Sequence, residues 1–113
     1  MKLKHFIISV LPGPPANLLH HFKNEKSDLT VTWNEPEHNG ADAFILRYIM
    51  EISTHEKPKD WIEFATLNVD ENNKMWHRMI EIDDWKMIGL RRLRVIAVNK
   101  DGRGEPSNEI NLA

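Results

Sequence analysis

The sequence predicts an all-β protein built as a seven-stranded antiparallel β-sandwich. Three observations lead to this fold class: short runs of alternating apolar and polar residues, turn-forming residues between those runs, and no helical apolar stripe over ten or more residues. The clearest run is residues 29–33 (LTVTW), which places Leu29, Val31 and Trp33 on one face of a half-buried strand. At 113 residues with 41% hydrophobic composition, the chain suits a single domain with one core.

Six further runs complete the expected sandwich, and turn-forming residues separate them. Pro36 and Asn39-Gly40 follow the strand at 29–33, and Pro58 interrupts the chain before the fourth run. The glycine-bearing segment 100–104 is expected to form a hairpin turn. The seven expected strands are residues 16–22, 29–33, 44–52, 61–67, 76–82, 92–99 and 110–112.

Composition excludes several classes of function. Lys and Arg total 15 against 17 Asp and Glu, so no global positive field exists to hold nucleic acid or acidic lipid. The chain has no cysteine, which removes disulfides, thiolate zinc sites and cysteine nucleophiles. Its six histidines lack the helical spacing of a metal site, and no serine lies in a G-x-S-x-G setting. We therefore expect no catalytic residues, no metal site and no cofactor, and the chain is not expected to be an enzyme.

The N-terminal residues 1–11 only superficially imitate a signal peptide. Their apolar run is short, is interrupted by Ser9, and ends in Pro12-Gly13-Pro14-Pro15 instead of a small-residue cleavage site. The run is also far shorter than the roughly 20 residues needed to span a bilayer. We expect residues 1–11 to be a strand-like tail or linker from a preceding element, followed by one domain over residues 12–113.

The order of these landmarks resembles that of a fibronectin type III domain over nearly the whole chain. The landmarks are Pro12-Gly13-Pro14-Pro15 with Asn17-Leu18, residues 29–33 with Pro36 and Asn39-Gly40, Tyr48 followed by Glu51, Trp61, and residues 94–107 (RVIAVNKDGRGEPS). Each landmark is weak alone, but their ordered sum is specific. The resemblance implies an immunoglobulin-like sandwich that serves as a repeated module in multidomain proteins.

One landmark of that family is absent. Trp85 stands where the family has its corner leucine, and Arg91 stands where it usually has the tyrosine that begins the sixth strand. In sandwiches that have it, the tyrosine hydroxyl bonds a backbone group at the crossover between the sheets, so this chain must satisfy that group differently. We expect Trp85 to cover the corner instead.

A cluster of arginines provides the first candidate binding site. Alternation along residues 92–99 turns Leu93, Val95 and Ala97 toward the core. The residues expected to share the opposite, outward face with the neighbouring strand are Arg47, Ile49, Arg92, Arg94 and Ile96. One interpretation is an ordinary solvated face whose guanidinium groups pair with Glu51, Glu63 or tryptophan rings.

The other interpretation is a partner-binding face, because arginine and aliphatic side chains are common at interfaces and guanidinium groups hold carboxylates or sulfates bidentately. In either case, reversing the charge of Arg92 and Arg94 is expected to leave folding nearly intact.

The hairpin turn at 100–104 is the second candidate, since loops at the end of a rigid sandwich often carry binding function. Its charged residues are Lys100, Asp101 and Arg103. They do not form the Arg-Gly-Asp order of integrin ligands, so the resemblance transfers no adhesive activity to this turn.

The resemblance implies a noncatalytic protein-protein interaction and spacer module. Two settings stay open: the extracellular part of a cell-surface adhesion or guidance receptor, or a giant intracellular filament protein of muscle, in the cytoplasm of the sarcomere. The expected partners are neighbouring immunoglobulin or fibronectin modules or other protein domains, and also a sulfated polysaccharide. Nucleic acid and direct membrane insertion of this segment are not expected.

Overall fold

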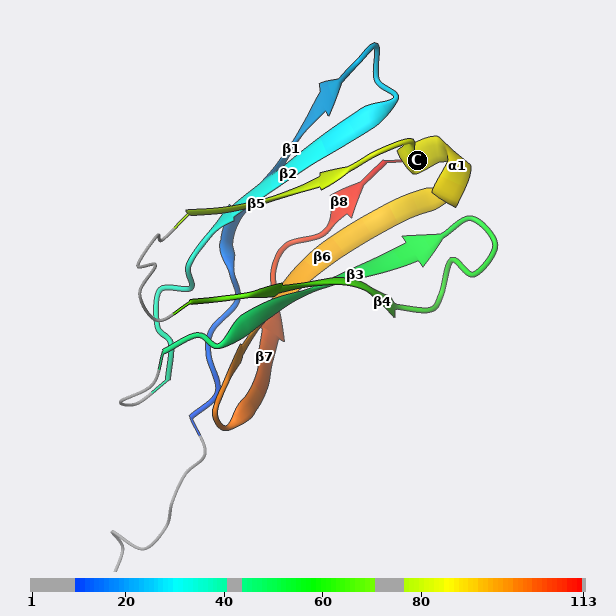
Figure 1. Cartoon of the computed structure of the whole chain (residues 1–113). Coiled ribbons are helices and arrows are strands. Elements are labelled where there is room, and N and C mark those ends of the chain that lie inside the picture. The colour runs from blue at the N-terminus through cyan, green and yellow to red at the C-terminus, as the bar shows by residue number, and fades with distance from the viewer. Residues whose placement is uncertain (1–9, 41–43, 71–76, 113) are drawn as a thin grey trace, which may run out of the picture.

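The protein folds as two antiparallel β-sheets packed face to face, as the sequence predicts. The computed structural model describes residues 10–40, 44–70 and 77–112, and Figure 1 shows its two layers. The strands are β1 (Ala16–Lys23), β2 (Asp28–Asn34), β3 (Arg47–Thr54), β4 (Ile62–Asn68), β5 (His77–Ile82), β6 (Leu90–Asn99), β7 (Gly102–Pro106) and β8 (Ile110–Asn111). One short helix, α1 (Trp85–Ile88), links β5 to β6.

The first sheet has the order β1-β2-β5, and the second has the order β4-β3-β6-β7, with β8 also pairing with β6. Sequential hairpins form within each sheet, and the chain crosses between sheets through longer connections. The first described residues and the C-terminal end lie at opposite ends of the sandwich, with α1 at the C-terminal end (Figure 1).

The strand expected at 110–112 is β8, and an additional strand, β7, precedes it; both pair with β6, with a break between them. The break falls at Ser107, whose Oγ accepts a hydrogen bond of 2.9 Å from the backbone N–H of Val95. Interpreting residues 100–104 as a turn was therefore wrong for residues 102–104, which belong to β7. The glycines at 102 and 104 conceal the strand from a pattern of side chains, but the ladder with β6 supplies its hydrogen bonds.

The third strand also begins at a different residue than predicted. The expected strand 44–52 begins at Arg47 and continues to Thr54, so Phe44 precedes it and is 53% exposed. Trp76, the first residue of the expected strand 76–82, lies outside the described residues, as do residues 1–9 of the expected tail. Within residues 10–40, 44–70 and 77–112, no helix has the length and apolar character needed to cross a membrane.

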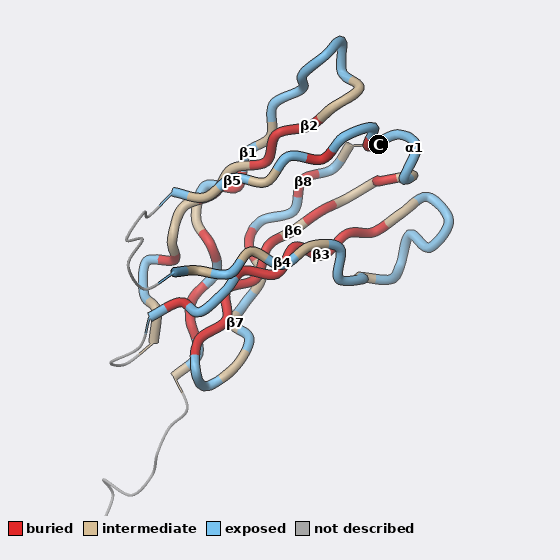
Figure 2. The backbone as a smooth tube through the Cα atoms, viewed as in Figure 1, coloured by how far each residue is buried: buried red, intermediate tan, exposed pale blue. Residues whose placement is uncertain are grey.

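The core fills the space between the two sheets, as the buried segments in Figure 2 show. Leu29, Val31 and Trp33 are fully buried, which agrees with the alternation of residues 29–33. The Trp33 ring meets Tyr48 from the other sheet edge-on, with ring centroids 5.5 Å apart. These contacts join the two layers and hold the strands in register.

Trp85 covers the corner where the tyrosine is missing. The residue is only 7% exposed, and its indole N–H donates a 2.9 Å hydrogen bond to the carbonyl of Lys26. The backbone N–H of Trp85 donates to the carbonyl of Ser27, and Phe22 packs against the indole at 5.7 Å between centroids. Trp85 thus ties the crossover between the sheets to the β1–β2 hairpin.

Candidate partner-binding face

The outward face of β3 and β6 brings all five predicted face residues together. In the antiparallel register, Arg47 lies opposite Val98 and Ile49 lies opposite Ile96. Further along the same pair of strands, Glu51 lies opposite Arg94, and Ser53 opposite Arg92. We call this surface the arginine face and define it by Arg47, Ile49, Arg92, Arg94 and Ile96.

The aliphatic members of the arginine face are not accessible. Ile49 is only 5% exposed and Ile96 only 4%, so the expectation that they lie on an open surface was wrong. The cause is their central place in the sheet: β4 flanks β3 with Thr66 opposite Ile49, and β7 flanks β6 with Pro106 opposite Ile96. A partner would therefore meet the polar members of the arginine face first.

A tryptophan ring holds two of the arginines. Trp61 immediately precedes β4, and the guanidinium of Arg94 lies 4.1 Å from its ring centroid. The guanidinium of Arg92 lies 4.6 Å from the same centroid. Both distances are within the range of cation–π attraction, which fixes these long side chains against the sheet.

The buried carboxylate of Glu51 binds both Arg94 and Arg103. The side chain of Glu51 is only 8% exposed, and its Oε1 accepts a 2.8 Å hydrogen bond from Nε of Arg94. Its Oε2 accepts a 2.7 Å hydrogen bond from Arg103. Burial raises the pKa of Glu51, but the hydrogen bonds and charges of Arg103 and Arg94 outweigh burial and leave that pKa below its ordinary value of 4.5.

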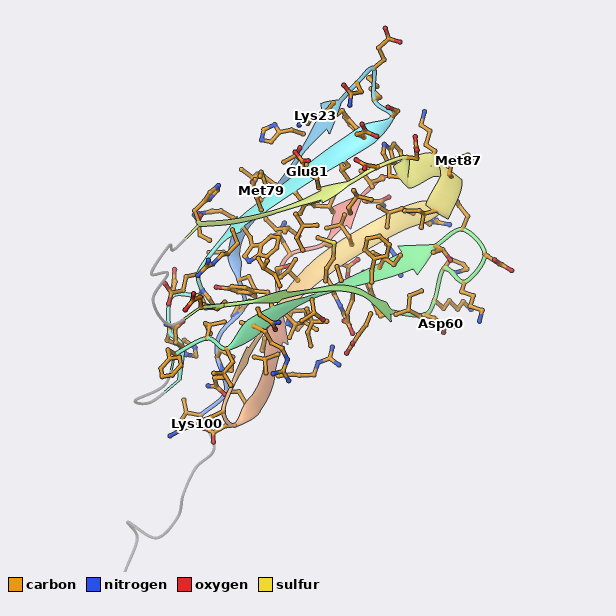
Figure 3. The ribbon with its side chains drawn as sticks, in the orientation of Figure 1. Lys23, Asp60, Met79, Glu81, Met87 and Lys100 are labelled. Carbon is orange, nitrogen blue, oxygen red and sulfur yellow. The ribbon has the colours of Figure 1, made fainter. Side chains whose placement is uncertain are left out.

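Arg103, predicted for the second candidate site, instead contacts Glu51 beside the arginine face. It belongs to β7, and besides Glu51 it approaches Glu63 at 3.7 Å. The other two residues proposed for the turn, Lys100 and Asp101, stay exposed at the β6–β7 turn, and Figure 3 shows Lys100 at its tip. The predicted turn site is therefore divided, because alternation along β7 directs Arg103 across the sheet.

Arg92 is also fully engaged within the molecule. It donates a 2.7 Å hydrogen bond to the carbonyl of Pro58 in the β3–β4 loop and pairs with Glu109 at 3.0 Å. Among the face arginines of the described chain, only Arg47 has no ion pair, and it is exposed. Arg92 and Arg94 thus follow the solvated-face interpretation, in which guanidinium groups pair with glutamates and a tryptophan ring of the same chain. Arg47 is open to a partner.

This geometry changes what a charge reversal does. A glutamate at position 94 would lie beside the buried carboxylate of Glu51 and would leave that carboxylate with one cation fewer. We therefore expect reversal at Arg94 to destabilise the fold, contrary to the expectation from the sequence, whereas the expectation for Arg92 stays a prediction. The sequence contains the signal for this pairing, since Glu51 and Arg94 are directly cross-strand, but only the register reveals it.

Comparisons with known proteins find the same architecture. No protein-family model matches the sequence. The twitchin kinase region from C. elegans matches 88% of this chain at 20% identity with a TM-score of 0.61, and domains A168–A170 of titin match 89% at 24% identity with a TM-score of 0.58. The fourth fibronectin type III domain of a human protein matches 88% at 20% identity with a TM-score of 0.59.

These likenesses show a fibronectin type III-like fold. At such identities they establish the fold alone, which agrees with the resemblance seen in the sequence. The chain spans 16% of the twitchin region, 32% of the titin segment and 75% of the human domain structure.

Proposed function

We propose that this chain is a noncatalytic recognition and spacer module of a multidomain protein, and that it binds an acidic protein partner through the arginine face. The observation that carries this proposal is the position of Arg47, an exposed guanidinium on the same pair of strands as Arg92 and Arg94, whose positions are already fixed. Side chains that are ordered before binding lose less conformational entropy when a partner arrives. The paired arginines therefore form an ordered surround, and Arg47 is the group on the arginine face that is open to a carboxylate.

The charge of this surface supports the same partner chemistry. Two arginines, Arg94 and Arg103, share the single carboxylate of Glu51, and Glu63 is 3.7 Å from Arg103. Arg47 adds a positive charge that no described acidic residue neutralises. Four arginines thus meet three glutamates, Glu51, Glu63 and Glu109, and this surface carries one net positive charge on a chain with a formal net charge of −2. That charge favours acidic segments in neighbouring immunoglobulin or fibronectin modules.

Of the two settings, a filament protein of muscle is better supported than a cell-surface receptor. Structures of titin and twitchin segments are among those that share the fold, and in each the likeness covers part of a longer, multidomain chain. Both settings use such modules in series, so the proposed role as a spacer applies in either one.

Binding to an acidic peptide tests the proposal. The wild-type protein serves as bait for a displayed peptide library, and the selected peptides are measured against Arg47→Glu by titration calorimetry. We expect the selected peptides to be acidic and to bind Arg47→Glu about tenfold or more weakly, since reversal replaces attraction with repulsion. The loss should shrink as salt is raised, because screening already weakens the wild-type contact.

Lys23→Glu is the matched control. Lys23 lies on the other sheet, where it forms an exposed ion pair of 2.9 Å with Glu81, and Figure 3 labels both residues there. The substitution makes the same change in net charge, so it should leave peptide affinity nearly unchanged. Equal losses in both variants, or selected peptides without acidic residues, would remove the arginine face from consideration. Heparin, measured against the same variants, tests a sulfated polysaccharide as the ligand.

A further inference from the structure

The segment that enters the sandwich is bound to it at several points. We call residues 10–13 the entry strap. Pro12 is among the most completely buried residues of the structure, although Leu11 beside it is 42% exposed. The backbone N–H of Gly13 donates a 3.0 Å hydrogen bond to the carbonyl of His38 in the β2–β3 connection. The entry strap therefore packs into the domain before the first strand begins.

Asn99, the last residue of β6, connects the entry strap to two other segments. Its side chain is 2% exposed, and its Nδ2 donates hydrogen bonds of 2.9 Å to the carbonyls of Val10 and Asn39. Its Oδ1 accepts hydrogen bonds from the backbone N–H groups of Asp101, at 2.8 Å, and Gly102, at 3.2 Å. All the hydrogen-bonding capacity of this amide is thus used to join the strap, the β2–β3 connection and the β6–β7 turn.

Two glycines make room for the strap. A Cβ at Gly104 would overlap the carbonyl oxygen of Pro12, and a Cβ at Gly40 would overlap that of Val10. Gly40 also adopts a φ of 95°, which side chains rarely allow. Close backbone approach at two points restricts the strap to one path across the end of the sandwich.

We infer that the entry strap is a rigid part of the module and that Asn99 fixes the direction in which the chain enters it. The consequence goes beyond recognition by the arginine face. The chain passes Val10 in a direction set by the sandwich, because Val10, Pro12 and Gly13 are each held by it.

Residual dipolar couplings measure this direction. We expect the N–H vectors of Leu11 and Gly13 to fit the alignment tensor of the β-strands in the wild-type protein. In Asn99→Ala, which removes the bond to Val10, these couplings should fall by about half or more. Exchange of the Gly13 amide with solvent should become about tenfold faster, as expected when a local hydrogen-bonded segment opens more readily.

Gly104→Ala provides an independent variant that acts on the strap by overlap with Pro12, without removing any hydrogen-bonding group. It should lower the same couplings, and it replaces Asn99→Ala if that variant fails to fold. Gly89→Ala is the control: Gly89 has a φ of 76° and no atom within 4 Å of an added Cβ, so substitution strains the backbone beside α1, at the far end of the sandwich (Figure 1). Its couplings at Leu11 and Gly13 should match the wild type.

Two results would overturn the inference. Wild-type couplings at Leu11 and Gly13 that do not fit the tensor of the strands would show a flexible entry. Couplings that remain unchanged in a folded Asn99→Ala or in Gly104→Ala would show that the strap does not depend on these contacts.

Discussion

Replacing Glu51 by glutamine tests how much the charge of Glu51 contributes to the stability of the fold. The change keeps the shape of the side chain but removes the charge that Arg94 and Arg103 share through contacts of 2.8 and 2.7 Å. Hydrogen bonds to charged groups contribute about 1.5–3 kcal/mol each when buried. The side chains of Arg94 and Arg103 are 22% and 46% exposed, so solvent screens part of this interaction. We expect Glu51→Gln to lower the free energy of unfolding by about 1–3 kcal/mol near neutral pH.

The stabilisation that Glu51 provides depends on pH. Because the folded state holds the pKa of Glu51 below 4.5, the carboxylate stabilises the fold at pH values above the unfolded-state pKa. That stabilisation is lost as pH falls through the folded-state pKa. The difference in unfolding free energy between wild type and Glu51→Gln should therefore be largest near neutral pH and shrink in acid.

Urea denaturation followed by tryptophan fluorescence, repeated over a series of decreasing pH values, measures both quantities. A difference below about 0.5 kcal/mol near neutral pH, typical of an exposed ion pair, would refute the reasoning. So would a difference of constant size at every pH, since it would arise from packing and not from the charge.

Three further predictions concern the core and the corner. Trp33→Ala should lower the unfolding free energy by about 3–5 kcal/mol in urea denaturation, since it empties a fully buried aromatic site; a change under about 1 kcal/mol contradicts this. Trp85→Phe removes the indole N–H bonded to the Lys26 carbonyl and should cost about 1–3 kcal/mol in the same assay, whereas no change would mean that this bond is not needed. Burial, aided by the charge of Glu35, raises the pKa of Tyr48 to about 12, so ultraviolet titration of this single tyrosine should show its midpoint well above 10.0, and a midpoint at 10.0 would contradict its burial. Since the unfolded chain ionises its tyrosine first, stability should also fall as pH rises between these two values.

Local patterns predict the strands that have one buried and one solvated face. Leu29, Val31 and Trp33 illustrate this, because each second residue meets the core and the alternation is unbroken. Residues 102–106 form a strand that local patterns do not predict. Their glycines carry no side-chain pattern, and only pairing with β6 makes them a strand.

The candidate site shows a similar division. Parity along two strands correctly brings Arg47, Ile49 and Arg94 to one face. Burial on that face depends on the flanking strands, so the covering of Ile49 could not be read from β3 alone. The contact of Arg103 with Glu51 joins residues that are 52 positions apart, and it depends on the strand order of the whole sheet.

The measurement that tests the central claim most directly is a nuclear magnetic resonance titration of the wild-type protein with an acidic peptide selected on it. We expect chemical shifts to change around Arg47 and its cross-strand neighbours Asn68 and Val98, and we expect Arg47→Glu to abolish these changes. Changes confined to Lys100 and Asp101 at the β6–β7 turn, or spread over the sheet that carries Lys23, would contradict the claim that the arginine face is the partner-binding site.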